Sequence, residues 1–84
     1  MTATRLRVPD RVRWALEMLD PGPADQVLEI GCGPGVAAAV VCERLTTGRL
    51  LAVDRSAVAT RRTAERNAEH VAAGRLEVRT VALD

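Results

Sequence analysis

Aromatic side chains are almost absent from this sequence of 84 residues, which has one tryptophan and neither tyrosine nor phenylalanine. A hydrophobic core must therefore come from other side chains, and hydrophobic residues make up 48% of the chain. Twelve basic residues against eleven acidic ones leave a net charge of +1, which gives no electrostatic reason to expect a nucleic acid or an anionic membrane as partner. We expect a small folded domain, and its net charge indicates neither a nucleic acid nor a membrane as a partner.

Long apolar runs and closely spaced cysteines are also lacking. The longest apolar run, residues 36–42, is far shorter than the ~20 residues that span a bilayer. No apolar stretch of the ~7 to 15 residues of a signal peptide follows the N-terminal arginines. Cys32 and Cys42 form no CxxC pair, so neither a metal site nor a redox motif is indicated. These absences predict a cytoplasmic protein with reduced thiols and no metal site.

Helical and strand patterns alternate along the chain. Amphipathic or alanine-rich segments predict three helices, at residues 10–19, 36–45 and 57–73. Short runs rich in aliphatic residues predict three strands, at residues 27–30, 50–54 and 76–81. Two prolines and a glycine in residues 20–23 separate the first helix from the first strand. The order is a leading helix followed by a βαβαβ unit.

Two of these elements carry specific packing predictions. The strand at residues 27–30 is a short apolar run bounded by turn signals, which is typical of a strand buried on both faces. The helix at residues 57–73 follows Ser56, a good N-cap residue. Its small and apolar residues on one face are expected to pack on the sheet: Ala57, Ala64, Ala68 and Val71. Trp14 of the leading helix is expected to pack at an edge of the core.

The alternation predicts an α/β fold with a parallel, Rossmann-like sheet. Right-handed crossovers that move in one direction give the strand order 3-2-1, which is half of a doubly wound fold. We expect a single partial domain, with the leading helix and its loop at residues 1–24 and the βαβαβ unit at residues 25–84. The first strand would then be an exposed apolar edge, which favours self-association.

The turn after the first strand has the most informative sequence, VLEIGCGPG. Gly31, Gly33 and Gly35 alternate through it, and without Cβ atoms their backbone can lie directly against a ligand. The following helix directs its unpaired N–H groups toward the same place. Asp54 ends the second strand, where a carboxylate can accept hydrogen bonds from both hydroxyls of a ribose. Together these features predict a nucleotide-type cofactor at the carboxyl ends of the first two strands.

The spacing of the glycines separates two classes of cofactor. The dinucleotide fingerprint G-x-G-x-x-G needs glycine at position 36, where this sequence has Val36. The E-x-G-x-G-x-G string from Glu29 to Gly35 instead resembles motif I of class I S-adenosylmethionine-dependent methyltransferases. The resemblance extends along nearly the whole chain and covers about the first half of that family's domain. It implies S-adenosyl-L-methionine as the cofactor.

The resemblance also implies a role for each matching position. Glu29 would help to hold the methionine end of the cofactor. The backbone of Gly31, Cys32 and Gly33 would pack against its amino-acid portion and ribose, with Cys32 a small filler of the loop. Asp54 would bind the ribose hydroxyls.

Two further positions are implied at the adenine end. Arg55 stands where the family often has an apolar residue along the adenine ring. Asp84 falls near the place of an acidic residue that contacts the adenine amino group after strand three. His70, late in the last helix, is explained by a favourable interaction with the helix C-terminus and is not assigned to catalysis.

The methyl acceptor and the catalytic residues stay unassigned. In the family, the acceptor pocket and any catalytic base come largely from strand four onward, so we expect these 84 residues to bind cofactor weakly and not to catalyse by themselves. Two alternatives remain open. One is an NAD(P)-binding oxidoreductase domain, and the other is a non-catalytic remnant that binds S-adenosylmethionine or dimerises.

Overall fold

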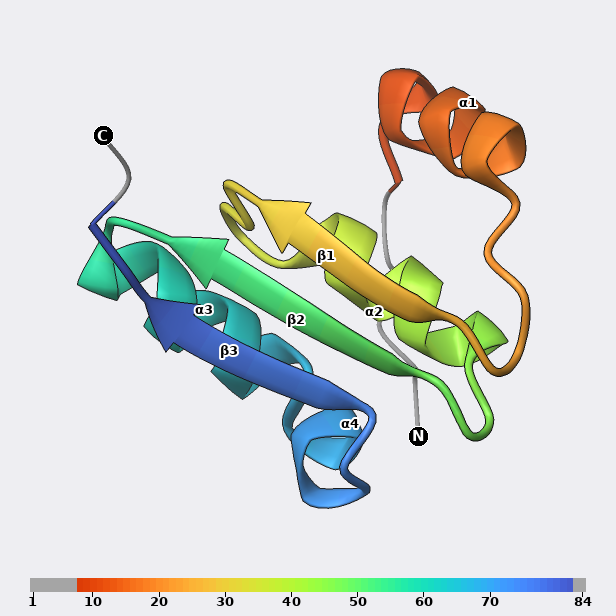
Figure 1. Cartoon of the computed structure of the whole chain (residues 1–84). Helices are drawn as coiled ribbons and strands as arrows, with labels where there is room; N and C mark the ends of the chain where they lie inside the picture. Colours follow the sequence, from red (N-terminus) through yellow and green to blue (C-terminus); the bar gives the residue numbers. More distant parts are fainter. Residues whose placement is uncertain (1–7, 83–84) are drawn as a thin grey trace, which may run out of the picture.

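A computed structural model describes residues 8–82 of the chain (Figure 1). Three strands form one parallel sheet in the order β1-β2-β3: β1 (Gln26–Ile30), β2 (Arg49–Asp54) and β3 (Leu76–Thr80). Four helices accompany them: α1 (Asp10–Leu19), α2 (Val36–Arg44), α3 (Ala57–Arg66) and α4 (Ala68–Ala72). The predicted α/β fold with a partial Rossmann-like sheet and strand order 3-2-1 is confirmed.

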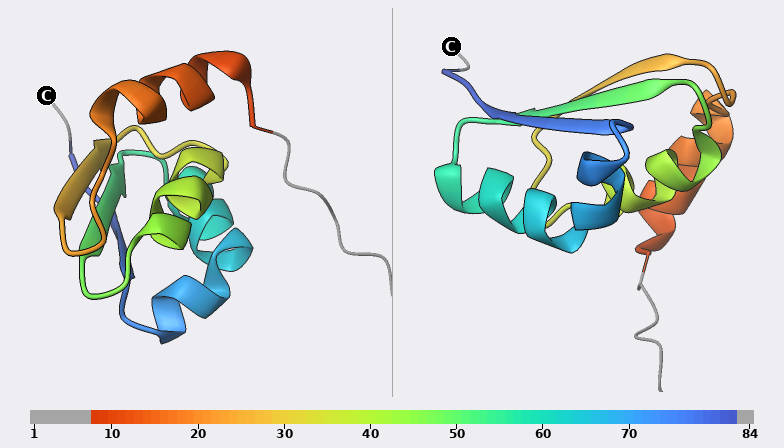
Figure 2. Two further views of the ribbon diagram at one scale, coloured as in Figure 1. Left: turned by 90° about the vertical axis from the view of Figure 1, so that its right-hand side faces the viewer. Right: turned by 90° about the horizontal axis from the view of Figure 1, so that it is seen from below.

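The helices that connect the strands lie on one face of the sheet, as both views of Figure 2 show. Alternate side chains of the strands point to that face, and they pack against α2 to form an aliphatic core. Its most buried members, at 1% exposure or less, are Ala38, Cys42, Leu50 and Ala52. The core therefore lies between β2 and the helical layer.

The leading helix α1 adds to the same layer. Leu16 is 5% exposed and belongs to the core, and its carbonyl oxygen accepts a 3.4 Å hydrogen bond from Nη1 of Arg44 at the end of α2. Trp14 is 65% exposed, so the expectation that it packs at a core edge is wrong. It lies two positions from Leu16 and thus on a different side of the helix, away from α2. None of the helices in residues 8–82 is long and apolar enough to cross a membrane.

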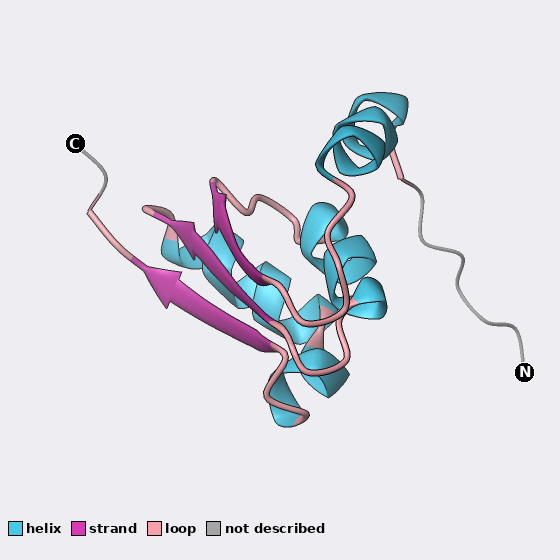
Figure 3. Cartoon of the chain, turned by 45° about the vertical axis from the view of Figure 1, so that its right-hand side comes forward, coloured by secondary structure: helices cyan, strands magenta, loops and turns pink. Residues whose placement is uncertain are grey.

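The prediction that the first strand is buried on both faces is wrong. Leu28 is 59% exposed and Ile30 is 66% exposed, whereas Val27 packs against the core. Side chains alternate along a strand, so Leu28 and Ile30 lie on the opposite face from Val27, which packs against the core. No helix of the described residues covers that opposite face of the sheet (Figure 3). In the described residues β1 is therefore an edge strand with only one of its faces covered.

The single helix predicted at residues 57–73 is interrupted. The N-cap prediction is confirmed, since Oγ of Ser56 accepts a 3.2 Å hydrogen bond from the N–H of Ala59. However, α3 ends at Arg66, because Asn67 leaves the helical conformation with φ −113° and ψ 31° before α4 begins. The N–H and Nδ2 of Asn67 both donate to Thr63 O, and Nδ2 also donates to Gly35 O. The break thus coincides with a contact to Gly35, in the glycine-rich loop of residues 31–35 between β1 and α2.

The face of this helical segment that packs inward also differs from the prediction. Ala57 and Ala68 are exposed and Val71 is 41% exposed, whereas Ala64 is half-buried. The buried positions are instead polar: Thr60, Thr63 and Asn67. Small apolar residues did not identify this face, because its contacts are hydrogen bonds to neighbouring segments rather than apolar packing.

Candidate cofactor site at the glycine loop

The candidate site lies where β1 and β2 end, beside the loop of residues 31–35 that leads into α2. This loop is fixed to the neighbouring strand, since the N–H groups of Gly31 and Cys32 both donate to the carbonyl oxygen of Val53, at 2.8 and 3.2 Å. The next residue of that strand is Asp54. Parallel pairing therefore brings the glycine loop and the acidic strand end together, as the sequence predicts.

The three loop glycines have positive φ angles but different surroundings. Gly31 and Gly33, with φ of 81° and 51°, have open space where a Cβ atom would stand. Gly35, with φ of 85°, has no such space, because a Cβ atom there would lie 2.8 Å from Cα of Thr63. Two glycines thus leave room for a ligand against the backbone, and the third permits close packing on α3.

Asp54 accepts hydrogen bonds from the backbone on both sides of it. Its Oδ1 accepts from the N–H of Ser56 at 2.9 Å, and its Oδ2 accepts from the N–H of Gly33 at 3.3 Å. These two hydrogen bonds, that from Ser56 first, hold the pKa of Asp54 below its usual value. The carboxylate has about four lone-pair directions, so acceptor capacity remains for the hydroxyls of a ribose.

Glu29 lies one strand away, on the helical face of the sheet. Its Oε1 is buried and has no hydrogen-bond partner within residues 8–82. Burial, and secondarily the negative charge of Asp54, raises the pKa of Glu29 from 4.5 to about 7. A buried carboxyl oxygen without a partner is costly unless a donor or a cation reaches it. It is therefore a position where a bound ammonium or N–H group would be favourable.

The remaining predicted site residues are placed as follows. Cys32 is 4% exposed with its side chain in the core, which fits the small filler of the prediction. Arg55 is exposed just after Asp54. Asp84 lies outside the described residues, so the structure does not place it. His70 accepts a 3.3 Å hydrogen bond at Nδ1 from Nε of Arg75, far along the chain from the loop.

Cys42 is another buried thiol in the described residues. It is fully buried in α2, and burial raises its pKa to about 11. A thiol that stays protonated at neutral pH is a poor nucleophile. Cys42 is thus a core residue.

Two residues that the sequence did not single out contact the glycine loop. Oγ1 of Thr63 donates to the carbonyl oxygen of Gly33 at 3.0 Å, and Nδ2 of Asn67 donates to that of Gly35 at 3.1 Å. Their signal in the sequence is a polar pair four positions apart inside a helix. Such a pair is also typical of a solvated helix face, so the sequence alone could not distinguish the two.

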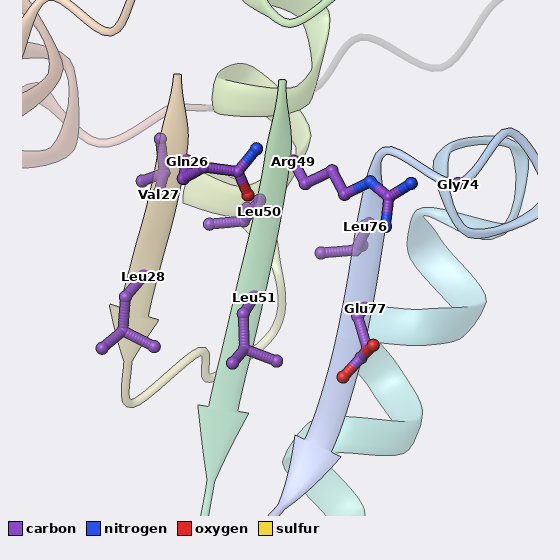
Figure 4. A pocket seen from close by; sticks show the side chains of 9 residues that line it. All are labelled: Gln26, Val27, Leu28, Arg49, Leu50, Leu51, Gly74, Leu76 and Glu77. Atoms are coloured by element: carbon purple, nitrogen blue, oxygen red, sulfur yellow. The ribbon is translucent and has the colours of Figure 1, made fainter. Parts of the chain in front are cut away.

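A hollow of about 520 Å³ lies elsewhere on the sheet (Figure 4). Side chains at one register position of the three strands line it, namely Leu28, Leu51 and Glu77. No residue of the glycine loop borders it, and neither does Asp54. The hollow reflects the uncovered face of the sheet and is separate from the candidate cofactor site.

Comparison with protein families gives one match over most of the chain. A family model described as protein-L-isoaspartate(D-aspartate) O-methyltransferase matches residues 4–82. The protein-L-isoaspartate O-methyltransferase of Methanopyrus kandleri is 43% identical over 51 residues, which cover 60% of this chain and 23% of that protein. The enzyme of the same name from Aeropyrum pernix is 39% identical over 51 residues, 60% of this chain and 20% of that protein. The matched part therefore spans about a fifth of the length of these relatives.

Solved structures share the fold. An S-adenosylmethionine-dependent O-methyltransferase from Thermotoga maritima superposes with a TM-score of 0.78 at 17% identity, over 95% of this chain and 31% of that protein. A geranyl diphosphate methyltransferase in complex with S-adenosylmethionine gives a TM-score of 0.68 at 24% identity, over 82% of this chain and 28% of that one. At these identities the likeness concerns the arrangement of strands and helices.

Proposed function

Because the chain belongs to the protein-L-isoaspartate(D-aspartate) O-methyltransferase family, we propose that it binds S-adenosylmethionine across the carboxyl ends of β1 and β2. Membership confirms the resemblance to class I S-adenosylmethionine-dependent methyltransferases that the EIGCGPG string indicated, and S-adenosylmethionine is the cofactor of that class. It also favours this class over the alternative of an NAD(P)-binding oxidoreductase domain.

One observation carries the proposal for the site. Open space lies at Gly31 and Gly33, and the loop that holds them adjoins two carboxyl groups of different character. Asp54, with its lowered pKa, accepts from the N–H of Gly33, and the partly buried Glu29 stands two residues before Gly31 in β1. S-adenosylmethionine has a ribose with two hydroxyl donors and a methionine end with an ammonium group. Asp54 would accept hydrogen bonds from the ribose, and Glu29 would face the ammonium end.

The backbone of the loop fits the middle of the cofactor. At Gly31 and Gly33 a ligand can approach the main chain without meeting a side chain. Cys32 between them directs its own side chain into the core and leaves this surface free. Arg55, exposed after Asp54, would lie along the adenine. Gly35 would pack the loop against α3 rather than touch the cofactor.

We infer the acceptor from the names of the relatives, which are protein-L-isoaspartate O-methyltransferases. Methyl transfer to the free carboxylate of an isoaspartyl residue forms a bond between the methyl carbon and a carboxylate oxygen by direct displacement. The bond between that carbon and the sulfonium sulfur breaks, and S-adenosylhomocysteine leaves. Such a reaction depends chiefly on alignment of the two reactants and exclusion of water. In the proposal this chain fixes the methyl donor, and the parts of the relatives outside the matched segment supply the acceptor pocket.

A non-catalytic remnant that binds cofactor or dimerises would show no turnover with any acceptor, and the proposal makes the same prediction for this chain alone. The proposal expects these 84 residues alone to bind cofactor weakly and to transfer no methyl group. The assay combines the purified, mass-verified chain with labelled S-adenosylmethionine and an isoaspartyl peptide. Robust label transfer would contradict the proposed division of labour, and no binding of cofactor analogue at all would contradict the proposed function.

A thermal-shift measurement tests the choice of cofactor. A ligand that binds only the folded state raises the unfolding temperature. S-adenosylhomocysteine, which keeps the ribose and methionine end, is expected to raise that temperature, whereas NAD at equal concentration is not. A larger shift with NAD would overturn the proposal.

A cytoplasmic location is also part of the proposal. It is supported by Cys32 and Cys42, which are both free and buried in the core. A protein that folds with unpaired thiols suits a reducing compartment. Fractionation of cells that produce the tagged chain tests this, and recovery in a secreted or membrane fraction would contradict it.

A further inference from the structure

The inward face of α3 is polar. Thr60, Thr63 and Asn67 are 7%, 0% and 3% exposed, and they are spaced three and four positions apart, on one side of the segment. The hydrophobic core beside them contains only apolar side chains. Buried polar groups are costly unless they are hydrogen-bonded, so the partners of these three indicate what the face does.

Two of the three bond to the glycine loop, from about thirty positions further along the chain. Thr63 Oγ1 donates to the carbonyl oxygen of Gly33 at 3.0 Å. Asn67 Nδ2 donates to the carbonyl oxygen of Gly35 at 3.1 Å and to that of Thr63 at 2.9 Å. Both loop glycines are therefore held through their carbonyl groups by side chains of one helical segment.

The backbones of α3 and the loop also touch. The Cα of Thr63 stands so close to Gly35 that a Cβ atom on the glycine would lie 2.8 Å from it. Helix and loop thus pack without an intervening side chain. The helical segment itself is interrupted at Asn67, whose departure from helical φ and ψ accompanies its bond to Gly35.

These contacts restrict a segment that is otherwise free to move. Glycine has the largest range of backbone conformations, and its ordering on ligand binding would cost conformational entropy. Fixing the carbonyls of Gly33 and Gly35 also fixes the peptide planes around them. The N–H of Gly33 belongs to the preceding peptide plane, and its 3.3 Å hydrogen bond to Asp54 holds that plane as well. The side of the loop opposite α3 is thereby prearranged for a ligand.

We propose that Thr63 and Asn67 are positioning residues that hold the glycine loop in its cofactor-binding conformation. The proposal rests on the proposed function for its ligand. It goes beyond that function in giving α3 a specific part in the affinity for S-adenosylmethionine. Neither side chain faces the open space at Gly31 and Gly33, so both act through the loop.

The test compares isosteric variants of two threonines on the same helix. Thr63→Val keeps the shape of the side chain and removes the donor to Gly33, whereas Thr63→Ser keeps the donor. Thr60→Val is the matched control, because Thr60 is similarly buried but its hydroxyl bonds Thr80 at 2.7 Å and not the loop. Amide hydrogen exchange of Gly33 and Gly35, S-adenosylhomocysteine affinity from NMR titration, and the unfolding temperature are measured for each.

We expect Thr63→Val to speed exchange of the loop amides and to weaken S-adenosylhomocysteine binding by about tenfold, the equivalent of one hydrogen bond. Thr63→Ser should largely restore both, and Thr60→Val should lower the unfolding temperature while leaving both unchanged. Asn67→Ala removes the donor to Gly35 at a position beyond the end of α3 and should loosen the loop as Thr63→Val does. This variant replaces Thr63→Val in the test if Thr63→Val does not fold.

Equal loss of stability in the two valine variants, with loop exchange and affinity unchanged in both, would overturn the proposal. If the unsubstituted chain shows no S-adenosylhomocysteine binding, the proposed function fails. The exchange rates of Gly33 and Gly35 still decide whether Thr63 and Asn67 hold the loop, since they are measured without ligand.

Discussion

The backbone N–H of Gly33 donates a 3.3 Å hydrogen bond to Oδ2 of Asp54, which stands 21 positions further along the chain. This bond joins the two features that the sequence marks as a nucleotide-type site, the glycine loop and the acidic end of the next strand. The same carboxylate accepts from Ser56, at the start of α3. Asp54 therefore links the loop, β2 and α3 in addition to its proposed contact with the ribose.

Replacement of this carboxylate by an amide tests its proposed role. Asp54→Asn keeps the size of the side chain and removes its charge. Hydrogen bonds to a charged group contribute about 1.5–3 kcal/mol, so we expect S-adenosylhomocysteine affinity to fall by about 10- to 100-fold. NMR titration measures the affinity.

Asp25→Asn is the control for this substitution. Oδ2 of Asp25 likewise accepts a backbone hydrogen bond, at 2.7 Å from the N–H of Gly22, but it lies before β1 and away from the loop. The affinity of Asp25→Asn for S-adenosylhomocysteine should equal that of the unsubstituted chain. Equal losses in the two variants would mean that Asp54 has no specific contact with the ligand.

The loop glycines offer a matched pair of substitutions. Gly31→Ala and Gly35→Ala place a Cβ at nearly the same positive φ, 81° and 85°, so both carry similar backbone strain. Only the second meets another atom, at 2.8 Å. We expect Gly35→Ala to lower the free energy of unfolding by about 1–3 kcal/mol more than Gly31→Ala, the usual cost of overpacking. Gly31→Ala should weaken ligand binding more than its small loss of stability accounts for.

Urea unfolding measures these free energies, and the ligand titration supplies the affinities. Equal destabilisation by the two substitutions would contradict the close packing of Gly35 on α3. Unchanged affinity in Gly31→Ala would contradict an approach of the cofactor at that position.

Glu29 gives the chain a predictable pH dependence of stability. Its pKa is raised from 4.5 to about 7 in the folded state, so the folded chain binds the proton more tightly than the unfolded chain does. This contribution to stability is fully present below pH 4.5 and is lost as the pH rises to about 7. Glu29→Gln, which cannot ionise, should remove that part of the slope. Unfolding free energies at several pH values test this, and identical pH profiles would show that Glu29 has no raised pKa.

Much of the fold was predictable from the sequence, because it follows from local patterns. Glycine and proline mark the loops, short aliphatic runs mark the strands, and the alternation of helices and strands indicates a parallel sheet. The exposure of Leu28 and Ile30 could not be read in the same way. An apolar run reports what a strand can bury, and the described residues supply a helical layer for only one face of β1.

The candidate site likewise contains residues that the sequence predicts and residues that only the packed structure identifies. The glycines and Asp54 were found from sequence because their spacing along one βαβ unit is characteristic. The partners in the second crossover were missed, since the bonds from Thr63 and Asn67 to the loop depend on how this crossover packs beside the loop. The unpartnered Oε1 of Glu29 was also invisible, because burial of a single oxygen atom is a property of the packed structure.

We propose that the chain associates with a second copy of itself through β1, because one edge and one face of this strand are uncovered. β1 is the edge of the sheet in the described residues, and the exposed side chains of Leu28 and Ile30 adjoin that edge. Such an edge favours pairing with a second chain. Sedimentation velocity should show association that increases with concentration.

Leu28→Lys places a charge on this strand and should reduce the association. Val58→Lys is the control, because Val58 is 50% exposed on α3 and lies away from the sheet edge. A chain that stays monomeric at all concentrations, or two lysine variants that behave alike, would argue against association through β1.

The central claim, a site for S-adenosylmethionine at the glycine loop, is tested most directly by an amide-resolved NMR titration of the chain with S-adenosylhomocysteine and, separately, with NAD. The account predicts chemical-shift changes with S-adenosylhomocysteine that concentrate at residues 29–35 and 54–56, and much smaller changes there with NAD. Changes confined to the uncovered sheet face around Leu28 and Leu51, or no changes at millimolar ligand, would contradict it.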